Sequence, residues 1–171
     1  ALNRRFSNAA RGTQSGTSRL PSGHRKCGAA WTLSEGMPVV SGKMAVVNSG
    51  KPSLTFYRVL ERFKRYTLVE ALIKTGRTHQ IRVHFQSIGY PMAVDALYGR
   101  QAAFYLSEIK GKSYKSGKYT EEERPLMDRT SLHSFRLRID HPHTGERLEF
   151  KAEPPKDFNA VLNQLRKWGL E

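Results

Sequence analysis

The chain has 171 residues, with 29 Lys and Arg against 15 Asp and Glu and a formal net charge of +14. This surplus favours a polyanionic partner, most often nucleic acid, because phosphate contacts use Lys and Arg; a basic protein with merely solvated charges is the alternative. The single cysteine excludes an intrachain disulfide. No apolar run approaches the roughly 18 residues of a membrane span. We therefore expect a cytoplasmic protein without membrane contact, although the Arg- and Ser-rich start also resembles an organelle transit peptide.

The first 36 residues differ in composition from the rest. Residues 1–8 are interpreted as the end of a helix. Residues 9–30 contain one large aliphatic residue, Leu20, among Gly, Ser, Thr, Arg and Lys. Such a stretch buries too little apolar surface to offset its ordering entropy. We predict that residues 1–36 are an atypical basic, Gly/Ser-rich segment, loop or disordered, and that residues 37–171 form the folded domain.

Three strands are predicted next. Residues 43–48 form a short strand, ended by the turn signals of Ser49–Pro52. Residues 53–62 and 66–74 are rich in β-branched and aromatic residues with period-two alternation. The basic connection between them is short, so these two strands are predicted to form a hairpin.

A helix is predicted after residue 77. Thr78 is a favourable N-cap. Gly89 suits the C′ position, and Pro91 prevents the helix from continuing. Three apolar residues spaced at i, i+4 and i+7 form a stripe along it: Ile81, Phe85 and Ile88.

The remaining elements complete an α+β arrangement, mainly an antiparallel sheet with helices packed to one side. Residues 92–95 are extended, and residues 110–123 are a mobile basic loop or a solvated face with no partner. Residues 131–139 form a strand with His133 directed inward, and residues 147–152 return antiparallel to it. A final helix carries one apolar face: Phe158, Val161, Leu162, Leu165 and Trp168.

The residues most able to carry chemistry lie between a strand and a helix, from Gly76 to His84. Gly76 is expected to allow a sharp turn and close backbone approach. The first helical turn offers unpaired N–H groups, with Arg77 ahead of it and Arg82 inside it, which favours a carboxylate or phosphate. An N-capped amphipathic helix with solvated arginines is the alternative. His79 and His84 are five residues apart, which does not match a helical zinc pair, so no metal is expected.

Residues 76–99 read GRTHQIRVHFQSIGYPMAVDALYG. This run strongly resembles the RluA-type family of RNA pseudouridine synthases, in which a GRTHQIRVH segment precedes a Gly-containing turn, a short strand and an Asp-x-Leu-Tyr-Gly end. The resemblance extends over residues 37–168. It implies that residues 37–171 are the carboxy-terminal part of a pseudouridine synthase catalytic domain.

The resemblance implies an isomerase that converts uridine to pseudouridine in structured ribosomal or transfer RNA, as a monomer and without a cofactor. In the family an aspartate attacks a flipped-out nucleoside, and the base detaches, rotates and reattaches through carbon. The arginine of the His-Gln-Ile-Arg unit pairs with that aspartate, a role that falls here on Arg82. Ile81 is expected to pack near the pocket. The other motif residues are expected to shape it or touch RNA: Arg77, Thr78, His79 and Gln80.

The family's Arg-Leu-Asp motif is missing. Ser18–Gly23 has Pro21 where the aspartate would be needed, and we interpret this likeness as a coincidence. Residues 1–8 resemble the family helix that follows the aspartate motif, so the aspartate is expected upstream of Ala1. The family strand that carries a stacking tyrosine is also missing, and a local reading-frame change across residues 9–35 is one hypothesis for this. The chain alone is therefore expected to be inactive. A non-catalytic RNA-binding remnant or assembly factor, or a gene fragment that does not fold, are the alternatives.

Overall fold

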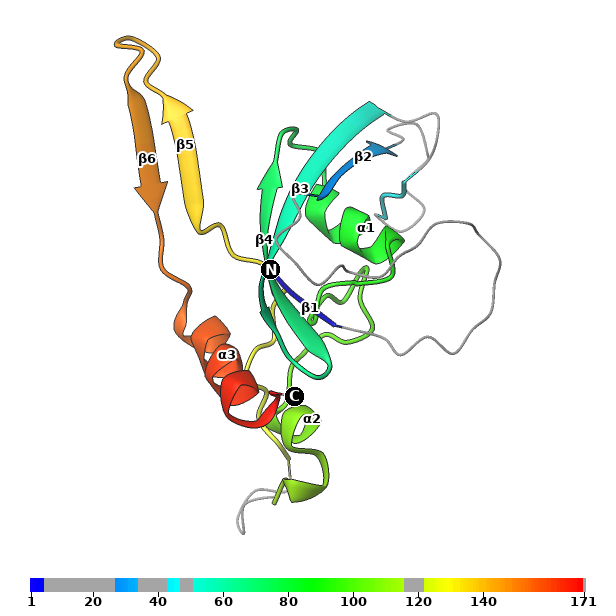
Figure 1. Cartoon of the computed structure of the whole chain (residues 1–171). Helices are drawn as coiled ribbons and strands as arrows, with labels where there is room; N and C mark the ends of the chain where they lie inside the picture. The colour runs from blue at the N-terminus through cyan, green and yellow to red at the C-terminus, as the bar shows by residue number, and fades with distance from the viewer. Residues whose placement is uncertain (5–26, 34–42, 47–50, 116–121, 171) are drawn as a thin grey trace.

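The computed structural model describes residues 1–4, 27–33, 43–46, 51–115 and 122–170 (Figure 1). One sheet has four antiparallel strands in the order β1-β4-β3-β2, and a second has two, β5 and β6. The strands are β1 (Leu2–Arg4), β2 (Cys27–Leu33), β3 (Lys51–Arg62), β4 (Tyr66–Ile73), β5 (Arg136–Asp140) and β6 (Arg147–Lys151). The helices are α1 (Gln80–Ser87), α2 (Leu106–Lys110), the 3-10 turn η1 (Gly111–Ser113) and α3 (Lys156–Trp168). None of the described helices is long and apolar enough to cross a membrane.

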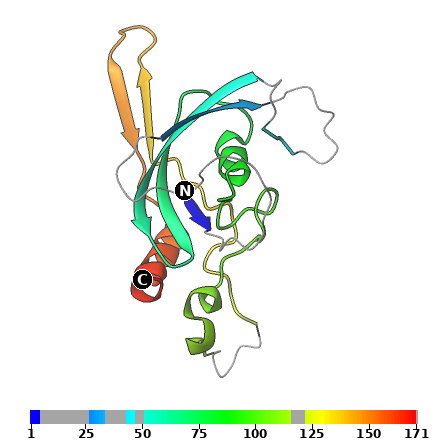
Figure 2. The ribbon, with the colours of Figure 1, turned by 45° about the vertical axis from the view of Figure 1, so that its right-hand side comes forward.

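The long β3–β4 hairpin is the centre of the fold, and helices pack on both of its faces (Figure 2). Along β4, Tyr66 and Leu68 belong to the core cluster that contains the apolar face of α3. Val69 belongs to the cluster that contains Phe85 of α1. Because neighbouring strand residues point to opposite faces, α1 and α3 lie on opposite sides. The α+β class is confirmed, but the expectation of helices to one side is wrong.

The hairpin itself is confirmed. β3 and β4 pair antiparallel across residues 63–65. β3 begins at Lys51, so Lys51 and Pro52 belong to the strand and not to the predicted turn. The strand predicted at residues 43–48 is not observed in its described part. Residues 43–45 belong to no strand, and Val46 forms an isolated β-bridge. Residues 47 and 48 lie outside the described part.

Two strands lie where the sequence predicted a helix end and a loop. Residues 2–4 form β1, which pairs with β4 and buries Leu2. Residues 27–33 form β2, which pairs with β3 over its whole length. Ladder hydrogen bonds to a neighbouring strand override weak local propensity, which composition alone does not reveal. Residues 5–26 and 34–36 lie outside the described part, so the division of the chain at residue 36 stays a prediction.

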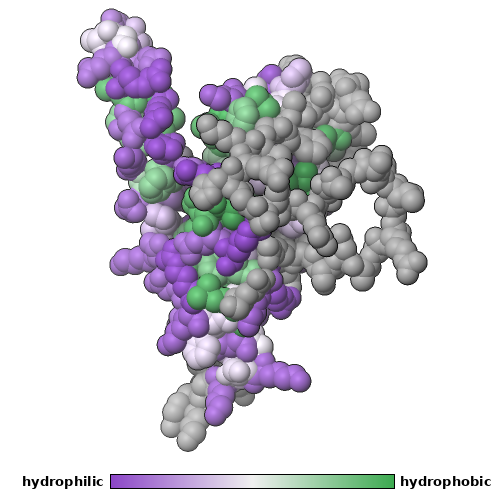
Figure 3. Space-filling model, in the orientation of Figure 1, coloured by the Kyte–Doolittle hydropathy of each residue, from purple (hydrophilic) through white to green (hydrophobic). Residues whose placement is uncertain are grey.

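The carboxy-terminal hairpin differs most from expectation. β5 begins at Arg136, five residues later than predicted, because Ser131 instead bonds irregularly to Leu2 and Val94. His133 is half-buried, and its Nε2 lies 2.7 Å from the Ala152 carbonyl. The β5–β6 hairpin extends away from the four-stranded sheet (Figure 1). Four apolar residues on this hairpin or next to it are about half exposed: Phe135, Leu137, Ile139 and Phe150. In Figure 3 hydrophobic atoms appear among the hydrophilic ones along this arm.

The last two predictions are partly confirmed. Four apolar residues of α3 are buried as expected, but Trp168 at its end is 44% exposed because it lies beyond the core. The predicted basic loop of residues 110–123 begins with the end of α2 and with η1. Residues 116–121 lie outside the described part.

Candidate active site

The chain enters α1 through a tight loop. His79, the residue before the helix, has φ of 55°, in the left-handed region that non-glycine residues seldom adopt. The side-chain oxygen of Gln80 accepts hydrogen bonds from the Arg77 N–H (3.1 Å) and from Thr75 Oγ1 (2.8 Å). The Gln80 side chain therefore holds the loop that leads into the helix.

Two expectations for this loop are wrong. Thr78 is exposed, lies before the helix and does not cap it. Gly76 is not among the described residues with positive φ, and a Cβ placed on it would meet nothing within 4 Å. The loop bends at His79, and the Gln80 side chain holds it by accepting hydrogen bonds from residues that precede the helix, without capping the helix. The Gly89 terminus is confirmed, since Gly89 has φ of 82° just after the helix.

Gln80 and His84, one helical turn apart, attach α1 to β3. The amide nitrogen of Gln80 donates to the Leu54 carbonyl (3.1 Å) and to Thr55 Oγ1 (2.9 Å). The ring nitrogens of His84 lie 2.8 Å from Thr55 Oγ1 and 2.9 Å from Ser53 Oγ. Both side chains are 3% exposed. Burial lowers the pKa of His84 to about 4, so this imidazole is neutral at pH 7.

The predicted apolar stripe of α1 is confirmed. Phe85 is buried against Val69 of β4 and Met92, and Ile81 and Ile88 pack against the same cluster. Ile81 thus helps to fix α1 on the sheet. The residues of α1 therefore point in three directions: the apolar stripe faces the core, Gln80 and His84 face β3, and Arg82 points away from both.

Arg82 makes a side-on ion pair with Asp95. Its Nε donates to Oδ2 and its Nη2 to Oδ1, both at 2.7 Å. The Asp95 side chain is fully buried, and that of Arg82 is 18% exposed. Burial alone would raise the pKa of Asp95, but hydrogen bonds from Arg82 and from the N–H groups of Tyr98 and Leu97 outweigh it and hold that pKa below its usual value. The pair is therefore ionised at neutral pH.

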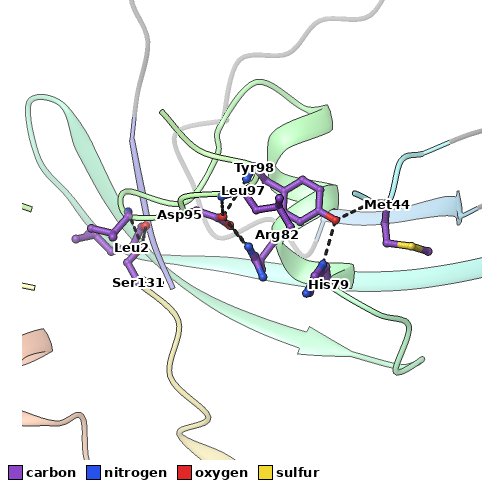
Figure 4. A network of polar contacts seen from close by, with 9 residues as sticks. Leu2, Met44, His79, Arg82, Asp95, Leu97, Tyr98 and Ser131 are labelled. Atoms are coloured by element: carbon purple, nitrogen blue, oxygen red, sulfur yellow. Dashed lines mark hydrogen bonds and ion pairs between the residues drawn. The ribbon is translucent and has the colours of Figure 1, made fainter. Parts of the chain in front are cut away.

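The turn after Asp95 is built around this carboxylate (Figure 4). Asp95 Oδ1 accepts the N–H groups of Leu97 and Tyr98, both at 2.9 Å. A Cβ on Gly99 would approach the Asp95 carbonyl oxygen to 2.6 Å, so this position requires glycine. The preceding Val94 N–H donates to Ser131 Oγ, which in turn donates to the Leu2 carbonyl. The contact with β1 thus fixes the backbone before Asp95, and the turn after Asp95 fixes its carboxylate.

Tyr98 connects the turn to the start of α1. Its hydroxyl lies 3.0 Å from His79 Nδ1 and accepts the Met44 N–H at 2.6 Å. The guanidinium of Arg82 lies over its ring, 4.9 Å from the centroid. Burial and the nearby charge of Arg82 lower the pKa of His79. His79, Arg82, Asp95 and Tyr98 therefore form one connected polar network.

The sequence alone matches Arg82 with an aspartate upstream of residue 1 and assigns no role to Asp95 or Tyr98. A signal was present: Asp95 follows three buried apolar residues and precedes a turn, where an aspartate commonly accepts backbone N–H groups. Of the predicted site residues, His79 and Arg82 are brought together. Gln80 and Ile81 are directed toward the protein interior, Thr78 is exposed, and Arg77 is half-buried ahead of the helix.

Residues 31–87 match the family model of the RNA pseudouridylate synthases. The chain is 40% identical over 129 residues to "Ribosomal large subunit pseudouridine synthase D" of Nitrosomonas europaea, a match that covers 75% of this chain and 34% of the relative. It is 42% identical over 125 residues to the protein of the same name from Pseudomonas aeruginosa, covering 73% and 37%. The chain belongs to the RluA-type family of RNA pseudouridine synthases. The chain spans about a third of the length of these curated relatives.

Solved structures agree on the fold of the chain. "Human RNA Pseudouridylate Synthase Domain Containing 4" superposes with a TM-score of 0.53 at 24% identity, covering 82% of this chain and 56% of that one. "Human RNA Pseudouridylate Synthase Domain Containing 1" gives 0.51 at 24%, covering 91% and 53%. The α+β fold that the resemblance implied is thus confirmed.

Proposed function

We propose that this chain is part of the catalytic domain of an enzyme that isomerises uridine to pseudouridine in RNA. Its first candidate substrate is ribosomal RNA, because the names of its relatives specify the large ribosomal subunit; transfer RNA is the second. A net charge of +14 suits such a partner. The observation that carries the proposal is the Arg82 guanidinium, held in one orientation by a buried carboxylate. We also propose that the protein acts in the cytoplasm as a monomer.

Arg82 is proposed to orient the catalytic aspartate and keep it ionised. Asp95 occupies the Nε and Nη2 edge of the guanidinium. Within the described residues Nη1 makes no hydrogen bond, so a second carboxylate has a donor to approach. A guanidinium fixed in advance costs little reorganisation when a charge develops beside it. The isomerisation rearranges atoms already present in the uridine, so it requires no cofactor.

Asp95 is unsuited to be the nucleophile itself. It is fully buried and accepts hydrogen bonds from Arg82 and two backbone N–H groups. The sequence has three other aspartates, and two of them pair elsewhere: Asp140 with Arg147 and Asp157 with Arg129. We propose that the catalytic aspartate is not in this chain and that the chain alone is inactive. A non-catalytic RNA-binding remnant is the second candidate function, and it is favoured because Asp95, Asp140 and Asp157 are all paired with arginines.

The remaining motif residues are proposed to act around Arg82. Exposed Thr78 and half-buried Arg77 precede α1 and are proposed to contact RNA. His79, bonded to Tyr98 beside Arg82, is proposed to shape the pocket wall. Gln80 and Ile81 are proposed to shape it from behind, through β3 and the core.

The test uses the intact Nitrosomonas europaea relative, measured by pseudouridine formation in a ribosomal RNA transcript. Replacing the arginine that aligns with Arg82 by Ala should lower kcat/KM by about 100-fold or more, since a charge pair in the site is lost. Lys should restore only part of the rate, because it lacks the planar fork. Urea unfolding of each variant provides the control for folding.

Two results would contradict the proposal. If the Ala variant folds and its kcat/KM is unchanged, Arg82 does not have the proposed catalytic role. Robust pseudouridine formation by the present chain alone shows that it contains its own nucleophile. The chain can also be mixed with an inactive relative that lacks only the Arg82 equivalent. If the chain binds the transcript but no pseudouridine forms even in this mixture, the non-catalytic RNA-binding function explains the chain better than the catalytic one.

A further inference from the structure

A second basic site lies away from Arg82, where α2 and α3 end. Trp168, the last residue of α3, is 44% exposed. Lys110 Nζ lies 5.0 Å from the centroid of its ring and Lys167 Nζ lies 5.3 Å from it. Lys110 ends α2 and Lys167 belongs to α3, so two helices direct cations to one aromatic side chain.

A third segment adds charge at the same place. The β3–β4 connection reaches the end of α3, where the Lys64 N–H donates to the Gly169 carbonyl at 2.8 Å. This contact places exposed Lys64 and Arg65 beside the residue that follows Trp168. In Figures 1 and 2 the hairpin tip, α2 and the end of α3 lie close together, and the surface over these helices is mainly hydrophilic in Figure 3. We call Lys110, Lys167 and Trp168, with adjacent Lys64, the Trp168 patch.

The charges of this patch are not neutralised within the described residues. Neither Lys110 nor Lys167 forms an ion pair there, whereas the neighbouring Arg166 is paired with Glu61. Because both ammonium groups lie near 5 Å from the same ring, they are within about 10 Å of each other, roughly one Debye length at 0.1 M salt. Like charges held this close favour binding of a polyanion.

We propose that the Trp168 patch is a second RNA contact, at which an unpaired base stacks on Trp168 while Lys110 and Lys167 move from the ring to the flanking phosphates. An exposed aromatic ring among cations is the arrangement that binds single-stranded nucleic acid. A membrane or an acidic protein would supply negative charge but no base to stack. The proposal rests on the proposed function for its choice of RNA, and it adds a binding surface distinct from the Arg82 network.

The first test measures binding of the whole chain to a fluorescein-labelled oligouridine of about 12 nucleotides, within the range that one stacking surface accommodates. Lys110→Gln with Lys167→Gln should weaken binding about tenfold at low salt and reduce the salt slope by about 1.4, as expected for two lost phosphate contacts. The control is Lys151→Gln with Lys156→Gln, which removes the same formal charge from exposed positions elsewhere, of which Lys151 is paired with Glu149. The control should change affinity less than about twofold, since it removes only diffuse attraction.

The second test isolates the ring. Trp168→Phe should retain most affinity and Trp168→Leu should lose about tenfold, the usual range for one stacked base. With Trp31→Phe as background, Trp168 is the remaining tryptophan, and its fluorescence should be quenched by oligouridine but not by heparin. Thermal melting of each variant confirms that it folds.

Three outcomes would overturn the proposal: equal losses in the two lysine pairs, equal affinity of the Phe and Leu variants, or equal quenching by heparin, which would indicate a general polyanion site. The proposed function fails separately. It fails if the Arg82 equivalent is dispensable in the relative, whatever oligouridine does to Trp168. If the tests of the Trp168 patch fail but the relative still depends on its Arg82 equivalent, only the proposal of a second RNA contact is rejected.

Discussion

The start of α1 and the β5–β6 hairpin use the same residue types in opposite ways. Around α1, polar side chains are buried and bonded: Gln80 and His84 to β3, and Asp95 to Arg82. On the hairpin, apolar side chains such as Leu137 and Phe150 are each 53% exposed. The first region has a second layer over its sheet, and the second region has none among the described residues.

Each region also contains a bidentate Arg–Asp pair, and burial separates the two. Arg82 and Asp95 have side-chain exposures of 18% and 0%, against 69% and 59% for Arg147 and Asp140. An exposed pair is screened by water and contributes little. A buried pair becomes costly as soon as one partner is lost, because the other charge remains uncompensated. The environment therefore sets the energetic importance of each pair, although the local chemistry is the same.

The largest expected difference compares two phenylalanines. Phe85→Ala should lower the free energy of unfolding by about 4 kcal/mol, because it leaves a cavity between α1 and β4. Phe150→Ala on the hairpin should change it by less than about 0.5 kcal/mol, since about half of this residue is already exposed to water. Urea unfolding followed by circular dichroism measures both. Similar losses would mean that the hairpin face is covered in solution.

The second comparison is between the two carboxylates. Asp95→Asn should cost about 3 kcal/mol, because it keeps the side-chain size but leaves Arg82 beside a neutral amide in a buried site. Asp140→Asn should have no measurable effect on stability, because both partners are exposed. A double variant, Asp95→Asn with Arg82→Met, should recover part of the loss, since it removes the unpaired charge. An Asp95→Asn protein as stable as the unaltered chain would contradict this account of the network.

The same contrast explains which features the sequence predicts. The hairpin of β3 and β4, the stripe of α1 and the buried face of α3 follow from the periodicity of their own residues. The strands at Leu2–Arg4 and Cys27–Leu33 depend instead on a partner distant in sequence. Trp168 continues the apolar spacing of α3, so periodicity alone predicts that it is buried. It lies beyond the core and is exposed.

At the site, the sequence predicts the importance of Arg82 but not the partner that this chain supplies. Residue 82 and residue 95 are separated by a helix end and a turn, and only packing brings them to 2.7 Å. Likewise, Gln80 and His84 resemble surface polar residues in a helical pattern. Their burial follows from the hydroxyl groups of Ser53 and Thr55 on β3, which provide hydrogen-bond partners.

The smallest of the three effects is a pH dependence that belongs to the α1 side alone. His84 has a pKa of about 4 in the folded chain against 6.5 as its ordinary value. A base with a lowered folded pKa contributes stability that is fully present above the unfolded pKa and is lost as pH falls toward the folded one. Stability should therefore fall from pH 6.5 downward, by about 2 kcal/mol at pH 5.

Urea unfolding at pH 7, 6 and 5 measures this slope before most carboxylates titrate. His84→Gln should be less stable at pH 7 but should lose most of the dependence. The pKa of His79 is also lowered, by burial first and by Arg82 second, so His79 contributes in the same direction. His79→Gln is the matched control and should retain the larger part of the slope, because His84 is bonded at both ring nitrogens within a buried site. If His84→Gln keeps the full slope, the acid sensitivity arises elsewhere, and the buried polar contacts of α1 are not its source.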